Sequence, residues 1–152
     1  MRLWTLLAAI LQLRPVTWSV TAPKPVPAGS TVPITLVATI DDGWHLYSTT
    51  QPSGGPVPTR ITVAASPNFT ASGDLAFPKP TVAPDPNFGI NVETYERNVT
   101  FVIPVKIADN ARPGVDTLTI QARFQSCNAQ LCLPPHTQTV SVPVTVRAGA
   151  GR

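Results

Sequence analysis

The sequence predicts an all-β protein, an immunoglobulin-like antiparallel β-sandwich of about seven to nine strands in a single domain. The 18 prolines occur in almost every part of the chain, and helices tolerate internal proline poorly. Apolar and polar residues alternate over several long segments, which is typical of strands with one buried and one solvent-facing side. No segment shows a convincing helical pattern. A length of 152 residues with 43% hydrophobic residues suits one domain with its own core.

Four segments carry the clearest alternation, at residues 32–40, 99–107, 118–124 and 140–146. In each, every second residue is apolar and the residues between are mostly polar or small. We expect each to be a strand whose apolar side faces the core. The apolar residues are Val32, Ile34, Leu36, Ala38, Ile40, Val99, Phe101, Ile103, Val105, Ile107, Leu118, Ile120, Ala122, Phe124, Val140, Val142, Val144 and Val146.

Shorter strands are expected at Val16–Val20, Trp44–Ser48 and Thr59–Ala64. Turn signals separate the strands, notably Asp41-Asp42-Gly43 and Arg112-Pro113-Gly114. Outside the four long segments, the aromatic side chains are interpreted mainly as core or sheet-face packing.

Prolines also fall inside three of the expected strands. Because proline has no backbone N–H to donate, Pro33, Pro104 and Pro143 should lie at sheet edges or at bulges. The segment Phe77–Glu93 contains four more prolines and is expected to be a long irregular loop. Long loops in compact domains are often functional, so this loop is a candidate to cover a site.

The N-terminus predicts export. Arg2 followed by the apolar run Leu3–Leu13 resembles a signal peptide, which we assign to residues 1–13 with an uncertain cleavage site. The run is too short to cross a bilayer, which needs about 20 residues. The sandwich domain is assigned to residues 14–148 and a short tail to residues 149–152.

Several functional classes find no support in the sequence. The net charge is only +3 and the 11 Lys and Arg residues are scattered, so the sequence shows no row of basic residues of the kind that binds nucleic acids. The sequence has no G-x-S-x-G, no glycine-rich phosphate loop and no H-E-x-x-H. We therefore expect no nucleic-acid partner, no small-molecule substrate and no bound cofactor.

The only two cysteines, Cys127 and Cys132, lie in the segment FQSCNAQLCLPP with four residues between them. They would face each other at the base of a hairpin loop, within bridging distance. Cys127 continues the polar face of its strand, whereas Cys132 has the parity of the buried valines. A bulge is therefore needed, and Pro134-Pro135 is the expected place.

The residues alone leave three interpretations of this pair open. A structural disulfide is common in exported domains, but closing so short a loop stabilises the fold by only about 2 kcal/mol. A redox-active pair suits the same local geometry. A metal site would need Cys127 and Cys132 together with His136 and His45, and the C-x4-C-x3-H spacing is unlike common zinc sites.

The sequence resembles the N-terminal periplasmic domain of the thiol:disulfide interchange protein DsbD. The resemblance rests on FQSCNAQLCLPP, GWHLYSTTQ and VETYERNVTFVIPVKI, and it runs from about Val16 to Val146. It implies an immunoglobulin-like sandwich in the periplasm and an oxidoreductase role. Cys127 and Cys132 would form a reversible disulfide, with Cys132 making the mixed disulfides. The alternative function is an exported, non-catalytic binding module with a purely structural disulfide.

The resemblance also implies partners and neighbours of the pair. Electrons would come from a thioredoxin-like domain, itself reduced through a membrane-embedded reductase, and pass to thioredoxin-fold periplasmic proteins. Because the sequence contains neither of these donor domains, we expect a separate donor or a longer parent protein.

The segment DPNFG matches the aromatic cap loop of the family, which nominates Phe88 as the cap, flanked by Asp85 and Gly89. The segment GWHLY nominates Tyr47 and His45 beside the disulfide, and His45 stands where some members have tyrosine.

Overall fold

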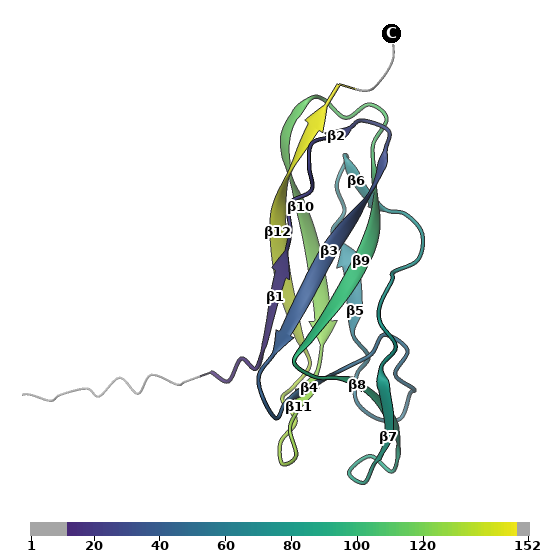
Figure 1. Ribbon diagram of the computed structural model, residues 1–152, viewed down its shortest axis with the longest axis vertical. Helices are drawn as coiled ribbons and strands as arrows, with labels where there is room; N and C mark the ends of the chain where they lie inside the picture. The colour runs from purple at the N-terminus through teal and green to yellow at the C-terminus, as the bar shows by residue number, and fades with distance from the viewer. Residues whose placement is uncertain (1–11, 149–152) are drawn as a thin grey trace, which may run out of the picture.

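A computed structural model describes residues 12–148, and within that range the chain forms strands, turns and loops without a helix (Figure 1). No helix in this range is therefore available to cross a membrane. The predicted signal peptide lies mostly outside the described residues, and the predicted tail lies wholly outside them. The strands are β1 (Val16–Val20), β2 (Val26–Pro27), β3 (Thr31–Ile40), β4 (His45–Tyr47), β5 (Arg60–Val63), β6 (Phe69–Ala71), β7 (Thr81–Asp85), β8 (Ile90–Tyr95), β9 (Asn98–Ile107), β10 (Gly114–Phe124), β11 (Ser126–Cys127) and β12 (His136–Arg147).

The twelve strands form three four-stranded sheets. Two of them, β1-β3-β9-β6 and β2-β12-β10-β5, make the sandwich. The third sheet, β11-β4-β8-β7, is built from short strands and lies at one end of the molecule, at the bottom of Figure 1. The prediction of an all-β sandwich is confirmed, and the extra short strands account for a count above nine.

The core follows the predicted alternation. Each of the four long alternating segments is a strand, and its apolar residues lie inside the sandwich. Phe101 is fully buried beside Trp18, whose ring centroid lies 6.0 Å away, and Trp18 also packs on Phe124 at 5.3 Å. These aromatic side chains join the two sandwich sheets, since β1 and β9 belong to one and β10 to the other.

The strand prolines lie where a neighbouring strand is missing. Pro33 and Pro104 face each other between β3 and β9, which are inner strands. However, β1 pairs with β3 only from Leu36 onward, and β6 pairs with β9 only from Val105 onward. Pro143 lies on β12, where β2 reaches only the last two residues. Local edges therefore explain Pro33 and Pro143, whereas Pro104 lies at an interruption between β6 and the bridge of Ala76 to Val102, where its carbonyl accepts from the N–H of Ser72 at 2.8 Å.

The prediction of an irregular loop at Phe77–Glu93 is wrong. Most of this segment is an antiparallel hairpin in which β7 pairs with β8 from Asp85↔Ile90 to Thr81↔Thr94. β7 is the outer strand of the third sheet, so its Pro84 is tolerated at a free edge. The many prolines in this segment argue against a strand in the sequence, but this strand tolerates them because it pairs with only one neighbour.

Candidate thiol–disulfide site

The site begins where the chain leaves one sheet for another. β10 ends at Phe124, which pairs with His136, and after Gln125 the chain enters the third sheet as β11. Two residues separate Phe124 from Cys127, whereas three separate Cys132 from His136. The extra residue lies in the arm that contains Pro134 and Pro135. This offset supplies the change of parity that the sequence required.

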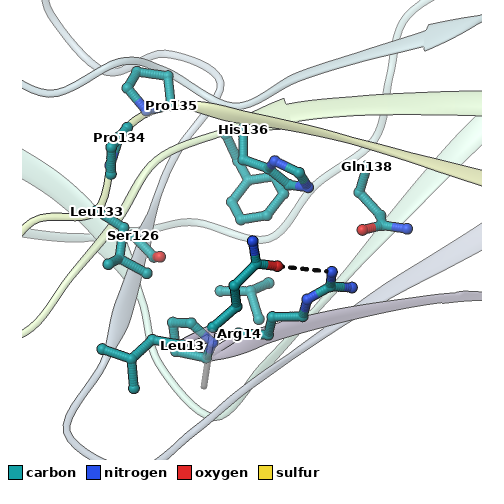
Figure 2. Close-up of a pocket in the computed structure, with 12 residues that line it drawn as sticks. Leu13, Arg14, Ser126, Leu133, Pro134, Pro135, His136 and Gln138 are labelled. Atoms are coloured by element: carbon teal, nitrogen blue, oxygen red, sulfur yellow. Dashed lines mark hydrogen bonds between the residues drawn. The ribbon is translucent and has the colours of Figure 1, made fainter. Parts of the chain in front are cut away.

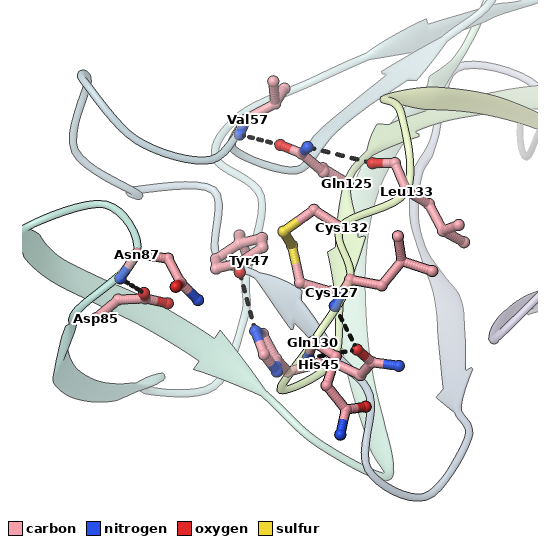
Figure 3. The surroundings of a disulfide bond; sticks show 12 residues. His45, Tyr47, Val57, Asp85, Asn87, Gln125, Cys127, Gln130, Cys132 and Leu133 are labelled. Atoms are coloured by element: carbon pink, nitrogen blue, oxygen red, sulfur yellow. Dashed lines mark hydrogen bonds between the residues drawn. A yellow bond between two sulfur atoms is a disulfide. The ribbon is translucent and has the colours of Figure 1, made fainter.

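The side chain of Gln125 holds this transition in place. Its Oε1 accepts a hydrogen bond from the N–H of Val57 at 2.9 Å, and its Nε2 donates to the carbonyl of Leu133 at 3.2 Å. One amide therefore ties the arm that follows Cys132 to the loop that precedes β5 (Figure 3).

Cys127 and Cys132 form a disulfide, with Cα atoms 4.0 Å apart (Figure 3). Asn128 orders the loop between them. Its N–H donates to the carbonyl of Leu131 at 2.8 Å, and its Oδ1 accepts from the N–H groups of Gln130 at 2.9 Å and Leu131 at 2.7 Å. The short loop is thus a hydrogen-bonded turn with its own internal support.

The two cysteines differ in accessibility. Cys127 is only 2% exposed, whereas Cys132 lies among the exposed residues of the loop. Cys132 is therefore open to solvent, whereas Cys127 is enclosed by its neighbours. This asymmetry is what an exchange pair needs, because one sulfur must meet the partner and the other must displace it.

His45 and Tyr47 lie beside the buried cysteine. β11 pairs with β4 so that Cys127 is directly opposite His45, and residues in such a pair project from the same side of a sheet. Tyr47 is two residues further along β4 and shares that side. The Nε2 of His45 and the hydroxyl of Tyr47 are hydrogen-bonded at 2.9 Å, with the rings edge to face.

Burial sets the protonation of this pair. Burial lowers the pKa of His45 from its usual 6.5, more strongly than the nearby carboxylates Glu96 and Asp85 raise it. Burial also raises the pKa of Tyr47 to about 12, with the charge of Asp85 adding to the effect. Both groups are therefore neutral at pH 7, and either can be the donor in their hydrogen bond, depending on the tautomer of the imidazole.

The turn between β7 and β8 lies against the cluster that contains the buried cysteine. Phe88 and Ile90 pack against the small buried cluster formed by Tyr47, Val92 and Cys127. Phe88 is half-buried, which fits a cap that closes over the sulfur while keeping one face in solvent.

Hydrogen bonds hold the turn that presents Phe88. The carboxylate of Asp85 accepts from the N–H of Asn87 at 2.8 Å, and the carbonyl of Asp85 accepts from the N–H of Gly89 at 2.8 Å. Gly89 has a φ of 69°, which favours glycine at this position. Asp85 and Gly89 thus shape the turn, whereas the contact with the cysteine cluster comes from Phe88.

A glycine on the other side of the cap is part of the same packing. A Cβ atom on Gly55 would lie 2.7 Å from Cδ1 of Ile90 and 3.7 Å from Cβ of Phe88. A larger residue there would require the Cδ1 methyl of Ile90 to move. Sequence reasoning identified neither Gly55 nor Val92 nor Gln125, because the contacts of each come from segments distant in the chain.

The metal interpretation does not match the geometry. The two sulfurs are bonded to each other, and His136 packs edge to face on Phe124, with ring centroids 5.9 Å apart. His136 lines a groove of about 380 Å³ beside the start of β12, together with Leu13, Pro134 and Pro135 (Figure 2). Within residues 12–148, no three His, Cys, Asp or Glu side chains are grouped closely enough to hold a metal ion.

The family model for the N-terminal region of the thiol:disulfide interchange protein DsbD matches residues 14–143 of this sequence. The chain belongs to the DsbD N-terminal domain family. No individually curated protein matches the sequence.

Two solved structures share the DsbD N-terminal fold with this chain. The N-terminal domain of DsbD from Neisseria meningitidis in the reduced form is 16% identical with a TM-score of 0.53, and the match covers 78% of this chain and 82% of that one. The N-terminal periplasmic domain of ScsB from Proteus mirabilis is 22% identical with a TM-score of 0.55, covering 86% of this chain and 46% of that one. Family membership and the disulfide together make this chain a thiol–disulfide interchange domain.

Proposed function

We propose that this domain carries reducing equivalents in the periplasm, from a thioredoxin-like or membrane-reductase donor to oxidised thioredoxin-fold partners. The observation that carries the proposal is the asymmetric disulfide, with Cys127 buried and Cys132 exposed on an ordered turn. The apolar N-terminal run of the sequence and the periplasmic setting named for the ScsB relative support export.

The exchange proceeds in two displacements. In the reduced domain, the Cys132 thiolate attacks one sulfur of the partner disulfide, which forms a mixed disulfide and releases one partner thiolate. The Cys127 thiolate then attacks the Cys132 sulfur, which closes the domain's own disulfide and releases the second partner thiolate. Two electrons pass to the partner, and both partner thiolates take protons from solvent. The donor dithiol recharges the domain by the reverse sequence.

The neighbouring side chains regulate access and protonation. Phe88 covers Cys127 so that small thiols do not discharge the pair, while Asp85 and Gly89 shape the turn that holds it. Tyr47 and His45 provide a neutral, hydrogen-bonded surface next to the buried sulfur. His45 can accept the proton that Cys127 loses when it becomes the attacking thiolate.

Covalent trapping tests the carrier function. In the Cys127→Ala variant no second thiolate displaces the partner from Cys132. This variant should therefore accumulate a mixed disulfide with an oxidised thioredoxin-fold protein, seen as a band on a non-reducing gel. The matched control Cys132→Ala should not, because its remaining sulfur is buried. Equal trapping by both variants, or none by either, would contradict the proposal.

The reduction potential separates the carrier from a non-catalytic module. A structural disulfide that resists exchange has a potential below about −300 mV, whereas thioredoxin-type donors lie near −270 mV. We expect a value in the donor range. A much lower value would favour the binding module with a structural disulfide.

A further inference from the structure

Two arginines face each other on the outer surface of the sandwich, close to the cysteine end. β5 pairs with β10 so that Arg60 lies directly opposite Arg123. Both side chains are exposed, and the residues that flank Arg123 on β10 are buried, so the pair points away from the core. Directly opposed residues place their Cβ atoms about 5 Å apart. Two positive charges are thus held side by side by the backbone register.

Neither arginine is neutralised within the described residues. The ion pair found between residues 12 and 148 is Lys106–Asp109, and no hydrogen bond there involves the guanidinium of Arg60 or Arg123. Like charges directly opposite in a sheet are unfavourable. Within residues 12–148, the two guanidinium groups therefore lie side by side without an ion pair or a hydrogen bond that would offset their repulsion.

The surrounding sheet surface is neutral. The neighbours of the pair in the β5-β10-β12 ladder are Thr62, Gln121, Thr137 and Thr139. The one carboxylate on these three strands is Asp116, seven residues from Arg123 along β10, where it accepts a hydrogen bond from Asn68 at 2.6 Å. An approaching carboxylate would meet two guanidiniums and no competing acid.

The arginine pair lies within reach of a partner bound at the disulfide. Arg123 precedes Cys127 by four residues, so at about 3.4 Å per residue the two Cα atoms are at most about 14 Å apart. A standard protein interface covers about 800 Å² per partner, which corresponds to a radius of roughly 16 Å. Because the Cα atoms of Cys127 and Cys132 are 4.0 Å apart, Arg123 lies at most about 18 Å from Cys132, at the rim of such an interface.

We propose that Arg60 and Arg123 form an electrostatic docking site for carboxylates on the protein that exchanges disulfides with Cys132. This inference rests on the proposed carrier function, since the same partner occupies both places. The planar, forked guanidinium binds carboxylate oxygens in pairs, so two adjacent forks suit an acidic patch. The pair would speed the encounter and orient the partner sulfur toward the exposed cysteine.

Charged peptide disulfides test the docking site. The probes are disulfide-linked dimers of a peptide with one cysteine and a tail of about ten residues, long enough at about 3.3 Å per residue to reach the pair. The tail is rich in Glu, in Lys or in Ser. The reduced domain should react at least about threefold faster with the Glu probe than with the Lys probe at low salt, and the preference should shrink near 0.5 M salt because exposed charges are screened.

The variants separate this surface from the net charge of the domain. R60Q/R123Q should abolish the preference for the Glu probe while leaving the rate with the Ser probe unchanged. The control R112Q/R147Q removes the same charge from exposed residues at the other end of β10 and β12, and should retain most of the preference. Equal loss in both variants, or no preference in the native domain, would overturn the docking site. Failure of Cys127→Ala to trap a thioredoxin-fold protein would instead reject the carrier function.

Discussion

Removing the aromatic ring of Phe88 should expose Cys127 to small reagents. Phe88 is half-buried and packs on the cluster of Tyr47, Val92 and Cys127. Fully burying a phenylalanine contributes about 1.5–3 kcal/mol, so half of that is about 0.8–1.5 kcal/mol for cap closure. Since about 1.4 kcal/mol is a factor of ten in an equilibrium constant, Phe88→Ala should raise the open population about four- to twelvefold.

Alkylation of the buried thiol measures this change directly. In a Cys132→Ser background only Cys127 can react, and its iodoacetamide rate should rise about four- to twelvefold when Phe88 is also replaced by alanine, because reaction requires the open cap. The control is Val82→Ala, which shortens an apolar side chain on the same hairpin that is 55% exposed. That variant should leave the rate within about twofold, as expected for a surface change.

Two outcomes would contradict the role of Phe88. A rise of less than twofold in the Phe88→Ala variant would show that the cap does not limit access to Cys127. An equal rise for Cys132 in a Cys127→Ser background would show general loosening of the end sheet, because Cys132 is already exposed. Either result would remove Phe88 from the proposed role.

Three further changes test other parts of the structure. Burial lowers the pKa of His45 in the folded domain, so its contribution to stability is fully present above pH 6.5 and is lost as the pH falls through the lowered pKa. His45→Gln should therefore flatten the fall in unfolding free energy on acidification. The exposed His136→Gln should not have this effect. Gln125→Ala removes two hydrogen bonds to the backbone and should cost about 1–3 kcal/mol in urea unfolding, whereas Gln121→Ala on the exposed face should cost less than about 0.5 kcal/mol. Phe101→Ala empties a fully buried site and should lower the unfolding free energy by about 3–5 kcal/mol, whether the cysteines are oxidised or reduced.

The sandwich could be predicted because its strands are long enough to show a period. β3, β9, β10 and β12 each span at least ten residues and repeat the same alternation. The third sheet gives no such signal, since β4 has three residues and β11 has two. The β7–β8 hairpin could not be predicted, because Pro84 indicates a break in a strand when only the sequence is known. A free sheet edge accepts proline, but the sequence does not show which strand lies at an edge.

The site was predictable in its chemistry more than in its geometry. Cys127 and Cys132 are evident from the sequence, and family resemblance nominated Phe88. The position of His45 opposite Cys127 depends on the chain changing sheets at Gln125, which no local pattern indicates. The close packing of Gly55 comes from the side chain of Ile90, 35 residues away in the sequence, so it is visible only after folding.

The two arms of the cysteine turn are anchored separately from the bond between the sulfurs. One arm pairs with β4 through Ser126 and Cys127, and the other returns through the N–H of Leu133, which donates to the carbonyl of Ser126 at 3.0 Å, before joining β12. None of these contacts involves a sulfur atom. We therefore expect the newly made polypeptide to reach its final shape while both thiols are still reduced, so that its maturation does not have to wait for an oxidant.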